Sequence, residues 1–72
     1  MKKTFELEDL DCAHCAQKMQ DAIAKIDGVE SVSVNFLAQK MTLEAADDKF
    51  DAILKEAIKT IAKVEPDCQV IL

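Results

Sequence analysis

Hydrophobic and polar residues alternate along three short stretches of the chain, which is the pattern of strands that bury one face. In the first stretch, Phe5 and Leu7 alternate with charged or polar neighbours. The second and third stretches cover residues 32–36 and 41–45, and the short turn between them predicts a β-hairpin. Residues 68–72 are apolar enough to predict a fourth strand.

Two other stretches repeat their apolar residues at intervals of three and four, which is the period of an amphipathic helix. The first helix is predicted to begin near Ala13 and to end at residues 27–28, where the only glycine can take a left-handed cap. Asp47 or Asp48 is predicted to cap the second helix, and Pro66 to stop it. The predicted buried faces are Ala16, Met19, Ile23 and Ile26, and then Phe50, Leu54, Ala57 and Ile61.

The predicted order of elements is strand, helix, strand, strand, helix, strand. Two right-handed crossovers joined by a hairpin produce the split β-α-β arrangement. We therefore predict an α+β fold, a ferredoxin-like βαββαβ sandwich in which a four-stranded antiparallel sheet carries both helices on one face. The chain has 72 residues and no linker or repeat, so a single domain is predicted over residues 1–72.

Composition and charge narrow the choice of partners and location. A formal net charge of −5 disfavours nucleic acid and anionic lipid as partners. No apolar run approaches the ~20 residues that cross a bilayer, and residues 1–3 lead into the first strand without the apolar stretch of a secretory signal. We expect a cytoplasmic, monomeric domain, and a last strand that ends at the terminus is typical of a domain excised from a longer protein.

The chain contains three cysteines, Cys12, Cys15 and Cys68, and an odd number argues against a disulfide scaffold. Cys12 and Cys15 fall where the first strand leads into the first helix, and free N–H groups at a helix start favour thiolates. The two residues between them allow both sulfurs to face one ion. Cys68 opens the last strand, beside the end of the first strand in this topology, although a buried hydrophobe is its commoner role.

Residues 10–16, Leu-Asp-Cys-Ala-His-Cys-Ala, resemble the metal loop of heavy-metal-associated domains, whose pattern is Gly-Met-x-Cys-x-x-Cys. Residues 28–29 and 32–35 also match the Gly-Val turn and the following strand of that family. The resemblance covers the whole chain and implies the same fold. Asp9 and Leu10 stand where the family usually has Gly and Met, and neither change affects the sulfurs.

Domains of this family are soluble metallochaperones, mercury-binding proteins or N-terminal domains of heavy-metal P-type ATPases. Asp11, directly before the first cysteine, is similar to the zinc, cadmium and lead branch of those ATPases, whereas copper(I) members usually carry Thr or Ser there. The resemblance implies a chain that is not itself an enzyme. It would bind Zn²⁺, Cd²⁺ or Pb²⁺ and either pass the ion to, or regulate, the membrane portion of a P-type ATPase at the cytoplasmic face. Another metal-transfer protein is the alternative partner.

Coordination chemistry agrees with a divalent ion. Two thiolates neutralise its charge and leave positions of a zinc tetrahedron open, and a carboxylate is a suitable third ligand that copper(I) does not favour. We therefore predict Cys12, Cys15 and Asp11 as metal ligands. A helix-capping role for Asp11 is an equal alternative that does not exclude ligation, and His14 or Cys68 are other ways of completing the site.

Two other functions stay open at this point. The same fold serves copper(I) in chaperones and copper ATPases, and Asp11 argues against that assignment. The Cys12 and Cys15 pair could instead carry out thiol–disulfide exchange, although the element order is not that of thioredoxin.

Overall fold

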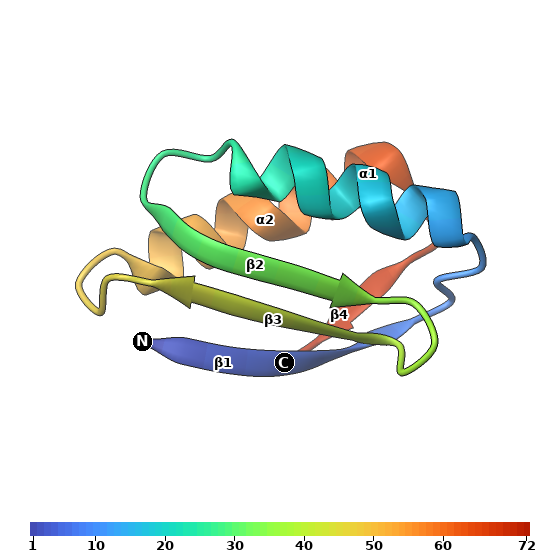
Figure 1. The fold of residues 1–72 in the computed structure, drawn as a ribbon, viewed down its shortest axis with the longest axis horizontal. Coiled ribbons are helices and arrows are strands. Elements are labelled where there is room, and N and C mark those ends of the chain that lie inside the picture. Colours follow the sequence, from blue (N-terminus) through green and yellow to red (C-terminus); the bar gives the residue numbers. More distant parts are fainter.

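Four strands form one antiparallel sheet, and two helices cover one of its faces (Figure 1). The computed structural model describes residues 1–72. In chain order, the elements are β1 (Lys2–Glu8), α1 (Ala13–Ala24), β2 (Val29–Asn35), β3 (Lys40–Ala45), α2 (Phe50–Val64) and β4 (Gln69–Ile71). The strands are ordered β2-β3-β1-β4 across the sheet, which confirms the predicted ferredoxin-like βαββαβ fold.

The central strand β1 pairs with β3 on one side and with β4 on the other, both antiparallel. Phe5 lies opposite Met41 of β3. Glu8, the last residue of β1, lies opposite Gln69, the first residue of β4. The start of β4 therefore lies beside the end of β1, as the topology predicted.

One core forms where alternating side chains of the sheet meet the apolar stripes of both helices. Ile53 takes the buried place on α2 that was predicted for Leu54, which is only half-buried. Burying one large apolar side chain contributes about 1.5–3 kcal/mol relative to leaving it exposed. The largest fully buried side chains are Met19, Ile23, Met41, Leu43, Phe50 and Ile61.

Helix α1 ends at Ala24, earlier than the predicted end at residues 27–28. The N–H groups of Lys25 and Ile26 bond to carbonyls three residues earlier, at 3.2 and 3.0 Å. These shorter-range bonds tighten the last turn and lead the chain out of the helix. Gly28 has a positive φ of 98°, so it makes the turn into β2 rather than the helix cap.

Helix α2 begins at Phe50 without the aspartate cap that the sequence predicted. Lys49 occupies the cap position and makes no side-chain cap hydrogen bond. Asp47 instead pairs with the terminal ammonium of Met1 at 2.7 Å.

Strand β2 is an edge of the sheet, and a side chain from α1 reaches one of its free backbone groups. The Val34 N–H donates to Oε1 of Gln20 at 2.9 Å. This bond ties the edge strand to the helix that lies over it.

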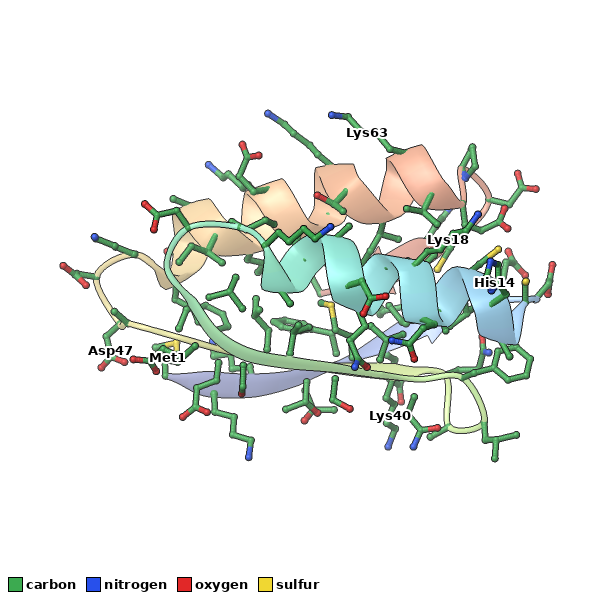
Figure 2. All side chains as sticks on the ribbon, turned by 45° about the horizontal axis from the view of Figure 1, so that its top comes forward. Met1, His14, Lys18, Lys40, Asp47 and Lys63 are labelled. Atoms are coloured by element: carbon green, nitrogen blue, oxygen red, sulfur yellow. The ribbon has the colours of Figure 1, made fainter.

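Three connections meet at one end of the molecule, namely residues 9–12, 36–39 and 65–68 (Figure 1). His14 lies at this end, whereas Met1 and Asp47 lie at the opposite end (Figure 2). Neither helix is long and apolar enough to cross a bilayer.

Candidate metal site

Residues 9–15, here called the metal loop, carry the chain from β1 into the first turn of α1. Leu10 is 2% exposed and anchors the metal loop in the core. Asp9 has a φ of 61°, a left-handed conformation that glycine adopts freely and that Asp tolerates better than most residues. The fold therefore accommodates Asp9 where the metal-loop pattern has glycine.

Cys12 is the N-cap of α1. Its backbone is extended, with φ −137° and ψ 120°, and its Sγ accepts a hydrogen bond from the Cys15 N–H at 3.3 Å. Its carbonyl accepts the first helical bond, from the Ala16 N–H at 3.0 Å. The capping alternative for Asp11 is therefore wrong, because the helix begins one residue later than that role requires.

The two loop thiols differ in acidity because they contact each other. A hydrogen bond with the Cys15 thiol lowers the pKa of Cys12, and the backbone N–H groups of Cys15 and His14 lower it further. The same thiol–thiol contact raises the pKa of Cys15, with burial and the negative charge of Cys12 adding to the effect. Cys12 is thus the first thiolate of the pair, and Cys15 keeps its proton longer.

Cys68 lies near the metal loop, as the topology predicted, but within the core. It is 5% exposed, and its N–H donates to the carbonyl of Glu65 at 3.1 Å. Burial raises the pKa of its thiol, and the carboxylates of Glu65, Asp9 and Asp11 raise it further. Cys68 therefore behaves as a small protonated hydrophobe in this structure.

Two other polar residues face this end of the molecule. His14 is exposed in the first turn of α1, between the two loop cysteines. Glu65, at the end of α2, was not a predicted site residue, yet its negative charge acts to raise the pKa of Cys12, Cys15 and Cys68 alike. The sequence could have indicated Glu65, because it lies in the connection between α2 and β4, and the predicted topology places that connection beside the metal loop.

Cys12 and Cys15 are the donor pair that the structure brings together, and both are half-buried. Asp11 is exposed and directly precedes Cys12. No group of three or more His, Cys, Asp and Glu side chains is arranged to hold an ion in this conformation. Two adjacent sulfurs at a helix start, one of them readily ionised, suit a soft metal ion.

The sequence of the chain is similar to those of several bacterial metal proteins. The copper chaperone CopZ of Bacillus subtilis is 35% identical over 66 residues, which are 92% of this chain and 87% of the chaperone. The cadmium, zinc and cobalt-transporting ATPase of the same organism is 27% identical over 66 residues. That match covers 92% of this chain but only 9% of the ATPase.

Solved structures agree with the sequence matches. The N-terminal domain of a potential copper-translocating P-type ATPase from Bacillus subtilis, in its Cu(I)-loaded state, superimposes with a TM-score of 0.78 at 27% identity. The superposition covers 99% of this chain and 84% of that domain. The family model of the heavy-metal-associated domain matches residues 4–66. The chain therefore belongs to the heavy-metal-associated domain family.

Proposed function

We propose that the chain binds Zn²⁺, Cd²⁺ or Pb²⁺ through the thiolates of Cys12 and Cys15, with the Asp11 carboxylate as a third ligand. The observation that carries this proposal is the capping of α1 by Cys12 itself. Because the thiol fills the cap, the carboxylate of Asp11 is exposed and does not hold the helix start. Asp11 directly precedes Cys12 in the sequence, so a rotation of the Asp11 side chain would bring a carboxylate oxygen toward an ion bound to the Cys12 sulfur.

The donor set favours a divalent ion over copper(I). Two thiolates balance a charge of +2, and zinc takes four ligands, with sulfur at ~2.3 Å and carboxylate oxygen at ~2.0–2.2 Å. Copper(I) prefers soft donors, so a nearby carboxylate adds little to its binding. Two thiolates and one carboxylate leave a zinc or cadmium ion with an open position.

That open position supports transfer of the ion to another protein. An incoming thiolate or carboxylate adds to the ion before one of the loop ligands leaves, so the ion is never released into water. The proposed recipient is the membrane portion of a zinc- or cadmium-translocating P-type ATPase. The similarity to the cadmium, zinc and cobalt-transporting ATPase supports this recipient.

Copper(I) transport is the second candidate, and one observation favours it. The copper chaperone CopZ matches 92% of this chain at 35% identity, and the chain spans 87% of the chaperone. In that case the two sulfurs alone hold the ion, and Asp11 is a surface residue that does not coordinate it.

Anaerobic titration of the reduced, metal-free protein separates these candidates. Zn²⁺, Cd²⁺ and copper(I) are each titrated against a competing chelator into the wild type and Asp11→Asn. We expect Asp11→Asn to weaken Zn²⁺ and Cd²⁺ binding by at least the ~10–100-fold seen when a metal site loses a supporting group, with copper(I) binding unchanged.

Asp9→Asn is the matched control, because it removes the same charge from the same loop and asparagine also tolerates a left-handed φ. It should leave all three affinities near those of the wild type. Cys12→Ser should abolish tight binding while the fold survives, since serine is itself a preferred N-cap residue. Cys68→Ser should keep the stoichiometry.

If Asp11→Asn weakened the binding of all three ions equally, Asp11 would not be a ligand. The same conclusion would follow if Asp9→Asn weakened Zn²⁺ and Cd²⁺ binding as much as Asp11→Asn does. Weak zinc binding beside tight copper(I) binding would favour the copper candidate. Turnover of a disulfide substrate by the thiol pair would favour thiol–disulfide exchange instead.

A further inference from the structure

Gln39, in the turn between β2 and β3, is bonded to the metal loop through both ends of its side-chain amide. Its Oε1 accepts from the Leu10 N–H at 3.1 Å, and its Nε2 donates to the Leu10 carbonyl at 2.7 Å. The second Nε2 hydrogen is donated to the carbonyl of Phe36 at 2.9 Å. The Gln39 carbonyl also accepts from the Leu7 N–H at 2.7 Å. The amide thus joins the hairpin turn to the metal loop with both of its donors in use.

The backbone of Gln39 has an unfavourable conformation. Its φ is 54°, in the left-handed region that residues with a β-carbon usually avoid. The only other non-glycine residue with a positive φ is Asp9, directly before Leu10. Strained residues persist where the surrounding structure holds them, and they concentrate at functional sites.

Leu10 has no other protein partner for its backbone N–H and carbonyl. The residue is 2% exposed, and buried backbone groups need a hydrogen-bond partner. Fixing both groups sets the peptide planes before and after Leu10, and Cys12 follows two residues later.

We propose that Gln39 is a positioning residue for the metal loop, which holds the Leu10 backbone so that the chain carrying Asp11 and Cys12 is already fixed in place before an ion binds. The inference rests on metal binding by the loop, the function proposed above. The Gln39 side chain bonds to Leu10 and Phe36 and to none of the predicted ligands, so its effect is preorganisation of the loop.

The test variant is Gln39→Gly, studied in the whole chain. Glycine adopts a positive φ freely, so the turn keeps its backbone while the amide is lost. We expect the Kd for Cd²⁺ to rise about tenfold, in the range found when supporting hydrogen bonds of metal ligands are removed. Dissociation of Cd²⁺ to a chelator should become faster by a similar factor.

Hydrogen exchange at the Leu10 amide provides a direct readout in the metal-free protein. Its only partner is the Gln39 side chain, so its exchange should speed up by about tenfold or more in Gln39→Gly. Asn35→Ala is the matched control, because Asn35 accepts from the Ala38 N–H at 3.0 Å in the same turn without touching the metal loop. It should change neither the Leu10 exchange nor the Cd²⁺ affinity.

Gln39→Asn keeps an amide and tolerates a positive φ, but its side chain is one methylene too short to reach Leu10. It should therefore behave as Gln39→Gly does. Unchanged Cd²⁺ affinity in both variants would overturn the proposal, as would loss of the fold in both, which would assign Gln39 a structural role. If the wild type itself fails to bind Cd²⁺, the proposed function fails, and Leu10 exchange still reports the contact on its own.

Discussion

Once Cys12 has lost its proton, the two loop thiols share the one that remains, and Cys15 holds it at a raised pKa. Contact with Cys15 lowers the pKa of Cys12, and contact with Cys12 raises the pKa of Cys15. An entering ion needs both sulfurs ionised, so it displaces the proton that Cys15 retains. Metal binding therefore releases protons, so affinity falls as the pH drops below the raised pKa of Cys15 and falls more steeply once Cys12 is protonated as well.

This unequal acidity has a chemical readout. In the reduced, metal-free protein at neutral pH, we expect iodoacetamide to modify Cys12 first, Cys15 later and the buried Cys68 last, because the thiolate is the reacting form. Timed quenching and peptide mass spectrometry measure the order. The advantage of Cys12 over Cys15 should shrink as the pH rises toward the raised pKa of Cys15. Equal rates at neutral pH would contradict the proton sharing described here.

Sequence patterns locate the thiol pair well but describe its surroundings only in part. The spacing of Cys12 and Cys15 and their place before a helix were readable from the chain. The residue that caps α1 could not be identified from the sequence. Asp11 and Cys12 are adjacent, and a shift of one residue in the start of the helix changes which of them is the cap. The contact of Gln39 with Leu10 was hidden as well, since 29 positions separate the two residues.

At the scale of elements, the turn from α1 into β2 depends on Gly28. Its φ is 98°, and a β-carbon there would lie 2.7 Å from Cδ1 of Ile53 on α2. We expect Gly28→Ala to lower the free energy of unfolding by about 1–2 kcal/mol, the cost of a left-handed backbone with a side chain. The thermal midpoint should fall by roughly 5–15 °C, measured by circular dichroism.

Ile53→Val removes the Cδ1 atom and shows whether the contact or the backbone dominates. Since Cδ1 is the free end of a flexible side chain, we expect the two substitutions to be nearly additive. A much smaller cost of Gly28→Ala in the valine background would assign the effect to the contact. A Gly28→Ala protein as stable as the wild type would contradict both explanations.

Five of the six elements could be predicted from periodicity, because the apolar residues of each repeat along one face, and β4 could be predicted from its apolar residues. Their ends were harder to place. At the end of α1, Lys25 and Ile26 make bonds that turn the chain out of the helix, and α2 follows Lys49 while Asp47 is paired with Met1. These hydrogen bonds and this ion pair are present where the sequence predicted helix caps. The types of the residues alone do not show which of the two arrangements forms.

At the scale of the whole molecule, metal binding and folding are coupled. A chain of 72 residues has a small core and modest stability. Because the metal loop forms only in the folded state, Cd²⁺ at 100 times its Kd should add about 2.7 kcal/mol to the free energy of unfolding. The thermal midpoint should rise by roughly 10–20 °C.

Thermal scans with and without Cd²⁺ measure this rise, and excess chelator should reverse it. Cys15→Ser is the control, since it lacks one of the two sulfurs and should show no rise. A wild-type midpoint that does not respond to Cd²⁺, at concentrations where titration shows binding, would mean that the unfolded chain binds the ion as well.

The hydrogen bond from Val34 to Gln20 bears on how the molecule behaves when crowded with copies of itself. An uncovered edge strand is a template on which other chains can add strands, and the growth of such stacks leads to fibrils. The Val34 N–H points away from β3 and is already engaged by Gln20. An incoming strand would have to displace the Gln20 side chain before it could pair with Val34, so this contact opposes extension of the sheet at that position.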